Sequence, residues 1–154
     1  MTQNEAGGFR RTWIDHTLEV EGSAEEVSAL LADIDGWPSW CPGLTAVKRK
    51  GTAKPKPGDR FTMMIKPASF HPPIPVPCEL YEIGPQRIVW GGGLPGSVVR
   101  HSFDIESLGA KRSRVRQYEY ATNLLAVLAL IAEPGIRKHD LRWQNALRDR
   151  FANS

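Results

Sequence analysis

Residues 98–122 read VVRHSFDIESLGAKRSRVRQYEYAT, and they predict a β-hairpin. Polar and apolar side chains alternate through both halves, as they do in strands that have one face in the core. Gly109-Ala-Lys111 separates the halves and has the composition of a turn. With the turn at this position, His101 lies directly opposite Glu119, and Phe103 lies opposite Gln117.

The same register predicts which side chains share a face of the hairpin. The inner face receives Val99, His101, Phe103 and Ile105, and the outer face receives Arg100, Ser102, Asp104, Arg112, Arg114 and Arg116. We therefore expect the His101–Glu119 pair to face the interior of the protein.

The residues before the hairpin predict a strand, a helix and a compact turn. Thr12–Val20 alternates like a strand. Ser23 and Glu26 have the spacing of a capping box, in which each side chain bonds the other residue's backbone N–H at a helix start. Trp37–Gly43 combines prolines and a glycine with two tryptophans that require burial, so we expect a packed turn there.

Further strands with turn residues between them predict a meander. The expected strands are Leu44–Lys50, Arg60–Lys66, Val76–Ile83, Arg87–Gly91, Val98–Ser107 and Arg112–Thr122. Pro67–Pro77 contains five prolines, which predicts either an edge segment or a loop.

The C-terminal part predicts a long helix. Asn123 is a candidate cap for the apolar run Leu124–Ala132, and Pro134-Gly135 is expected to kink or interrupt the helix. Beyond the proline, one stripe recurs at helical spacing and should lie on the sheet: Ile136, Asp140, Trp143, Leu147 and Phe151.

Composition limits the class of protein. A chain of 154 residues with 41% hydrophobic and 24% charged residues is typical of one globular domain. A net charge of +3, from 20 basic and 17 acidic residues, is too balanced to indicate nucleic-acid binding. No apolar run is long enough to cross a bilayer, and no apolar signal segment begins the chain, so we expect a cytoplasmic protein without stable membrane insertion. Cys41 and Cys78 are expected to be reduced thiols.

Five segments are typical of one known family: Ser23-Ala-Glu-Glu-Val27, Asp33-Ile-Asp-Gly-Trp37-Pro-Ser-Trp40, Val89-Trp90-Gly91, His101-Ser-Phe103 and Gln117-Tyr-Glu119. Through these segments the chain resembles the START-like helix-grip superfamily (SRPBCC), the polyketide cyclase/dehydrase and lipid transport family. They look most like a bacterial subgroup in which many members have no assigned activity. The usual glycine after the Glu-containing strand is absent, since Ala121-Thr-Asn123 stands there.

The resemblance covers nearly the whole chain and implies an α+β fold. One START-like ligand-binding domain would span residues 1–154, with residues 1–10 flexible. A curved antiparallel sheet of about seven strands would wrap around the long C-terminal helix, and two short helices would follow the first strand. The resemblance further implies a deep, mostly apolar cavity between the sheet and this helix.

The resemblance leaves the function open among members that bind hydrophobic molecules and members that transform them. Our first hypothesis is binding or transport of a lipid, an isoprenoid or a polyketide-like molecule, with His101 and Glu119 contacting its polar group. The alternative is a polyketide aromatase/cyclase or dehydratase, a lyase without a cofactor, in which His101 is the acid/base and Glu119 orients it. A third hypothesis is an interaction module whose outer arginines dock a partner protein. The sequence leaves homodimerisation open.

His101 and Glu119 are the only catalytic candidates, and a structural hydrogen-bonded pair is the ordinary alternative for them. The expected ligand-binding residues are Trp40, Phe61, Met63, Ile65, Tyr81, Trp90, His101, Phe103, Gln117, Glu119, Trp143 and Leu147. For each apolar residue of this set, plain core packing is the competing interpretation.

Other motifs do not indicate a cofactor or a metal. Gly91–Gly96 is rich in glycine, but it lacks the lysine-serine ending of a phosphate loop. His16, His71 and His139 have no zinc-type spacing. We expect neither a nucleotide site nor a metal site.

Overall fold

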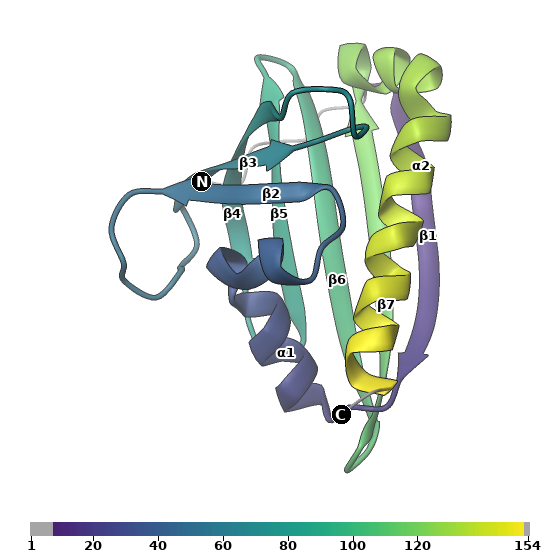
Figure 1. Ribbon diagram of the computed structural model, residues 1–154. Coiled ribbons are helices and arrows are strands. Elements are labelled where there is room, and N and C mark those ends of the chain that lie inside the picture. Colours follow the sequence, from purple (N-terminus) through teal and green to yellow (C-terminus); the bar gives the residue numbers. More distant parts are fainter. Residues whose placement is uncertain (1–7, 153–154) are drawn as a thin grey trace.

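The computed structural model describes residues 8–152, which form an antiparallel sheet, a short helical pair and one long helix (Figure 1). The seven strands have the spatial order β1-β7-β6-β5-β4-β3-β2. Their bounds are β1 Arg10–Val20, β2 Leu44–Arg49, β3 Arg60–Ile65, β4 Ile74–Ile83, β5 Arg87–Leu94, β6 Ser97–Gly109 and β7 Arg112–Thr122. The sheet curves around α2 (Asn123–Ala152), so the predicted α+β helix-grip architecture is confirmed.

The predicted register of the β6–β7 hairpin is confirmed. His101 pairs with Glu119, Phe103 with Gln117, and Ile105 with Val115. Strand β5 continues the first of these rows, because Trp90 pairs with His101. Paired residues share a face, so one row of side chains crosses the inner side of the sheet.

The predicted helix after β1 is α1 (Ala24–Ala32), and it begins with the expected capping box. Glu26 donates its backbone N–H to Ser23 Oγ, and its carboxylate accepts from the Ser23 N–H. The short 3₁₀ helix η1 (Ile34–Ser39) follows and carries Trp37 into the core, where its indole N–H donates to the Leu31 carbonyl at 2.9 Å. The packed turn predicted around Trp37 therefore includes a second short helix.

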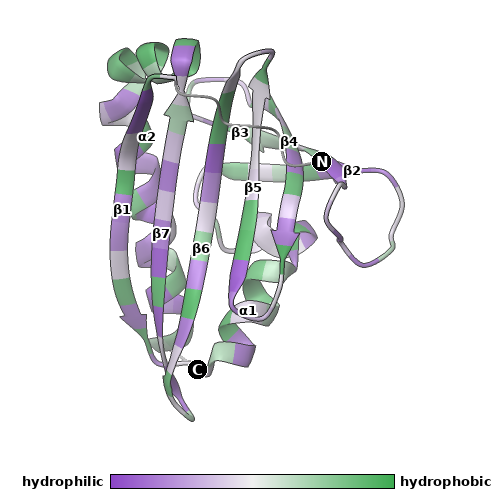
Figure 2. Ribbon diagram, turned by 180° about the vertical axis from the view of Figure 1, so that it is seen from behind, coloured by the Kyte–Doolittle hydropathy of each residue, from purple (hydrophilic) through white to green (hydrophobic). Residues whose placement is uncertain are grey.

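Helix α2 runs without interruption through Pro134. Its first turns cross one end of the sheet, and the remainder descends along the inner face, antiparallel to β7 (Figures 1 and 2). Asn123 has a φ of 50° and donates its side-chain amide to the Gly96 carbonyl. The free N–H of Leu125 instead bonds to Ser97 Oγ at 2.9 Å, so the helix start receives its cap from the β5–β6 turn.

Several predicted strand boundaries shift, since β1 starts at Arg10, β5 ends at Leu94 and β6 spans Ser97–Gly109. Strand β4 starts at Ile74, and Pro75 and Pro77 pair with β3, whereas the pairing of β4 with β5 begins at Glu79. Prolines are tolerated there because that side of the strand needs no hydrogen-bond donor. The flexible start predicted for residues 1–10 lies mainly outside the described residues, and Arg10 already belongs to β1.

Candidate functional site

A histidine and a glutamate from neighbouring strands meet on the inner face of the sheet. His101 Nδ1 lies 3.1 Å from Glu119 Oε2, as the register of β6 and β7 requires. The His101 ring stacks on Trp90, with 5.1 Å between centroids and an interplanar angle of 10°. The Glu119 side chain is only 3% exposed, whereas the His101 side chain is 21% exposed. The imidazole therefore stands between the carboxyl and accessible space.

Asp140 of α2 adds a second buried carboxyl to this pair. Its residue is 5% exposed, and hydrogen bonding between its carboxyl and that of Glu119 affects the pKa of both groups. Asp140 was predicted to lie on the apolar stripe of the helix, but no functional role was predicted for it. The sequence nevertheless contained a signal for such a role, because an acidic residue on a helix stripe that packs against a sheet must be buried or paired.

The three groups have pKa values far from the usual ones. Burial and, to a smaller extent, the neighbouring Glu119 together raise the pKa of Asp140 to about 9. Burial, partly opposed by hydrogen bonding from Asp140, raises the pKa of Glu119 to about 7. Burial lowers the pKa of His101 to about 4. Near neutral pH, the aspartic acid is thus protonated, the imidazole is neutral, and Glu119 is close to its titration midpoint.

The site consequently offers a proton donor and acceptors within one buried cluster. Protonated Asp140 can donate to a carbonyl oxygen, while Glu119 and His101 can accept from a hydroxyl group. Because the two carboxyls interact, their protons belong to the pair as much as to either residue. Such a cluster can orient a polar group or move a proton.

Two buried amides lie next to this cluster. Gln117 is two residues before Glu119 on β7, and Gln144 is one helical turn after Asp140 on α2, so both are displaced by roughly 6 Å in the same direction. Both residues are almost fully buried. Gln117 Oε1 and both amide atoms of Gln144 have no hydrogen-bond partner among the described residues. Buried amides without partners are uncommon in proteins, and here they extend the polar strip between β7 and α2.

Comparison with known proteins places this arrangement in a family. Residues 11–138 match the family described as polyketide cyclase / dehydrase and lipid transport. The chain belongs to this family. No curated protein matches the sequence significantly.

Solved structures of the family's fold match over almost the whole chain. A START superfamily protein from Mycobacterium smegmatis has a TM-score of 0.72 at 15% identity, covering 95% of this chain and 99% of that one. The Zhui aromatase/cyclase from Streptomyces sp. R1128 has a TM-score of 0.72 at 14% identity, covering 93% and 94%. A norcoclaurine synthase from Thalictrum flavum has a TM-score of 0.68 at 14% identity, covering 97% and 98%. At these identities the likeness establishes the helix-grip fold.

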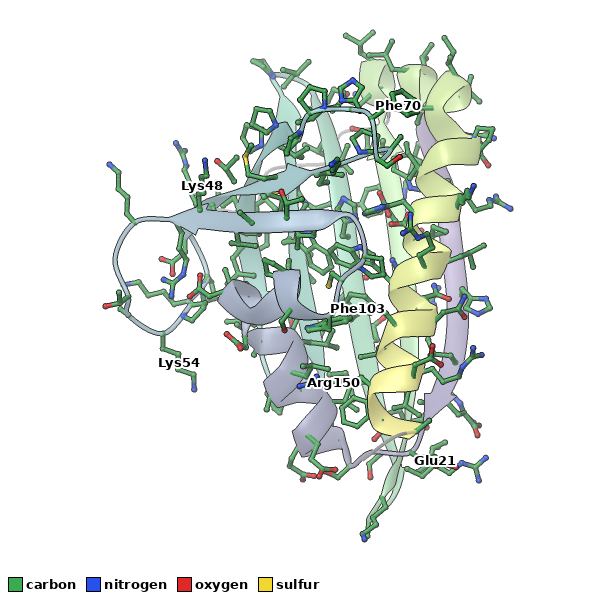
Figure 3. All side chains as sticks on the ribbon, in the orientation of Figure 1. Glu21, Lys48, Lys54, Phe70, Phe103 and Arg150 are labelled. Atoms are coloured by element: carbon green, nitrogen blue, oxygen red, sulfur yellow. The ribbon has the colours of Figure 1, made fainter. Side chains whose placement is uncertain are left out.

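The aromatic residues predicted to line the family's cavity pack largely against one another. The ring of Trp37 lies 4.9 Å from Trp90 and 5.9 Å from Trp143, and Trp90 lies 5.6 Å from Phe103. Phe103 lies in the middle of the molecule, between the sheet and the helices (Figure 3). This aromatic cluster fills the interior beside α1 and η1, and His101 stacks on its edge. Trp37, which we did not predict as a site residue, is at its centre.

The remaining predicted residues divide between the core and the outer face. Phe61, Met63 and Leu147 are buried in the core, while Trp40 and Ile65 are half-buried against it. The prediction that Tyr81 lines the interior is wrong. Leu80 of β4 takes the inward position, so Tyr81 points outward and lies 3.8 Å below the guanidinium of Arg100.

The outer arginines are paired within the chain. Arg112 and Arg114 bind Glu19, and Arg114 also binds Glu106. Arg116 makes a two-pronged contact with Asp15. The third hypothesis proposed these outer arginines as a docking site for an acidic partner. Their charges are largely neutralised by acidic residues of the same sheet.

Proposed function

We propose that this protein binds a hydrophobic small molecule between the sheet and α2, and that His101, Glu119 and Asp140 recognise one polar group of that molecule. The main evidence is the buried pair of carboxyl groups of Glu119 and Asp140. This pair lies beside the His101 imidazole, and the His101 side chain is 21% exposed. Three ionisable groups cost folding free energy in an apolar interior, and apolar residues of similar size would pack there at lower cost. A ligand's polar group would compensate part of that cost.

The chemistry of the surroundings supports a ligand that is mostly apolar. Indole and aliphatic groups flank the cluster. The Gln117 carbonyl oxygen and the Gln144 amide, which have no hydrogen-bond partner within residues 8–152, provide further polar contacts along one side. A hydrocarbon or fused-ring body with a carbonyl or hydroxyl group satisfies both environments. Lipids, isoprenoids and polyketide-like molecules have this composition.

Native mass spectrometry of the purified protein, followed by solvent extraction, tests the proposal. We expect a mass excess that an apolar compound accounts for, or saturable binding of the apolar fluorophore N-phenyl-1-naphthylamine. The variant Asp140→Asn should bind more weakly, while Asp104→Asn, a carboxylate change on the outer face of β6, should bind normally. An empty protein that also ignores the fluorophore would contradict the proposal.

One observation favours an aromatase/cyclase or dehydratase as the second candidate. Burial raises the pKa of Glu119 to about 7, and a neutral His101 stands beside it, so a proton can move within the cluster near neutral pH. In this mechanism the imidazole removes a proton next to a substrate carbonyl, and Asp140 donates to the carbonyl oxygen. Turnover of a poly-β-ketone surrogate should then disappear in His101→Ala while its binding remains. Equal product formation with and without the protein would exclude this candidate for that substrate.

A further inference from the structure

Large exposed apolar side chains are concentrated at one end of the molecule. They come from the start of β1, the β3–β4 connection, the β5–β6 turn and the first turns of α2, and we call this region the apolar end: Phe9, Phe70, Ile74, Leu94, Leu124, Val127, Leu128, Leu130 and Ile131. Among residues 8–152, Leu141 is the one large exposed apolar side chain that lies elsewhere. Figure 2 shows the hydrophobic colouring gathered over the first turns of α2.

Three of these segments are neighbours in space, and the fourth, the β3–β4 connection, lies at the same end of the molecule. Arg10, at the start of β1, pairs with Thr122, which directly precedes α2. Ser97 of the β5–β6 turn bonds to the Thr122 carbonyl and to the Leu125 N–H. Phe70 of the β3–β4 connection lies at the same end as the first turns of α2 (Figure 3).

The first turns of α2 expose far more apolar surface than they bury. Only the small side chains of Ala126 and Ala129 are buried on the sheet side. Leu124, Leu128 and Ile131 recur at helical spacing on the opposite side, and Ile131 is 84% exposed. A contiguous exposed patch of this kind marks an interaction surface.

The charges around the apolar end are mostly positive. The segments 8–11, 66–74, 92–98 and 123–138 carry the basic residues Arg10, Arg11, Lys66, Arg137 and Lys138, and the single acidic residue Glu133. Glu133 pairs with both Arg11 and Arg137, so it is already neutralised. An apolar surface with a basic margin is complementary to a bilayer that contains anionic lipids.

We infer that the apolar end docks this protein reversibly on an anionic lipid bilayer. The apolar side chains project from four separate segments and from more than one side of a helix, which suits insertion among acyl chains better than a single shaped groove on a protein. No helix within residues 8–152 is long and apolar enough to span a membrane, so the protein lies on the surface. Docking does not require the His101 cluster. Membrane docking and the proposed function can therefore be tested and refuted independently.

Flotation with vesicles tests the inference on the full chain. The vesicles are phosphatidylcholine alone and phosphatidylcholine mixed with phosphatidylserine. We expect binding to the mixed vesicles that weakens as salt is added, and a reduction of about tenfold or more in the double variant Leu128→Ser/Ile131→Ser. Leu141→Ser, the same change at an exposed site farther along α2, should bind like the wild type. Circular dichroism melting checks that all variants fold.

Three other results would overturn the inference. One is the absence of binding to both kinds of vesicle. Another is an equal loss of binding in Leu128→Ser/Ile131→Ser and Leu141→Ser. The third is a wild-type dimer in sedimentation equilibrium that becomes monomeric in the double variant, because a second copy would then cover the apolar end. An Asp140→Asn variant that still binds vesicles but binds N-phenyl-1-naphthylamine more weakly would separate docking from ligand binding.

Discussion

Replacing Glu119 with glutamine is expected to stabilise the folded protein, and the gain should grow as the pH rises. Burial raises the pKa of Glu119 from 4.5 to about 7 in the folded protein, while the unfolded chain keeps the ordinary value. Between these pKa values the folded protein holds a proton that the unfolded chain has released. The wild-type protein therefore loses stability by about 1.4 kcal/mol for each pH unit in this interval.

The interval between the two pKa values determines the size of the gain. The wild-type loss reaches about 3 kcal/mol at pH 7 and persists at higher pH. Glutamine has nearly the same shape and no charge, so Glu119→Gln avoids this loss. Below about pH 4 the two proteins should have similar stability, because the wild-type carboxyl is then protonated in both states. Removing the Glu119 charge also removes one cause of the raised pKa of Asp140, which adds to the gain.

Urea unfolding at about pH 5, pH 7 and pH 8.5 measures this difference directly. Glu106→Gln is the matched control, since Glu106 is an exposed glutamate on β6 that pairs with Arg114. Its effect should stay below about 1 kcal/mol at every pH. A Glu119→Gln protein that is less stable than the wild type at about pH 8.5, or a gain that does not change with pH, would refute the burial of a titrating carboxyl.

Other substitutions test the packing and the surface. Ser23→Ala removes the capping box of α1 and should lower the free energy of unfolding by about 1 kcal/mol; an unchanged urea midpoint would count against the cap. Leu147→Ala opens a cavity where α2 meets the core and should cost about 2–5 kcal/mol by the same assay, whereas a loss below about 1 kcal/mol would mean that α2 packs loosely there. Arg116→Ala breaks an exposed pair with Asp15 and should change the thermal midpoint very little; a large drop would show that the outer pairs are structural.

The β6–β7 hairpin was predictable because its determinants are local. The turn at Gly109-Ala-Lys111 and the alternation on either side determine the register, and the structure pairs His101 with Glu119 as expected. The capping box at Ser23 was predictable for the same reason, since it involves neighbouring residues only. The faces of the arginines on β7 followed from the same alternation.

The contribution of α2 was less predictable because it depends on long-range docking. Pro134 was expected to kink or interrupt the helix; the helix is not interrupted there, and its first turns run in a different direction from the remainder (Figure 1). Asp140 was recognised as part of the apolar stripe. Its contact with Glu119, however, depends on the position at which α2 packs along the length of β7. No local pattern specifies that position. Phe61, Trp90, Phe103 and Trp143 were correctly expected inside, but whether they line a space or pack on one another depends on their rotamers.

Tyr81 shows a further limit of sequence patterns. Leu80 and Tyr81 are adjacent in β4, so one of them must face outward. The larger aromatic residue was expected inside, but the structure buries Leu80 and places Tyr81 beneath Arg100. A tyrosine can take the outer position because its ring contacts a guanidinium and its hydroxyl remains near water.

The affinity of the wild type and of Asp140→Asn for the compound extracted from the purified protein tests the role of the inner cluster most directly. If an apolar molecule places its carbonyl or hydroxyl group against the carboxyl pair, the variant should bind about tenfold more weakly or worse, while Asp104→Asn keeps the wild-type affinity. Equal affinities in all three proteins would mean that the buried acids of β7 and α2 do not contact the ligand.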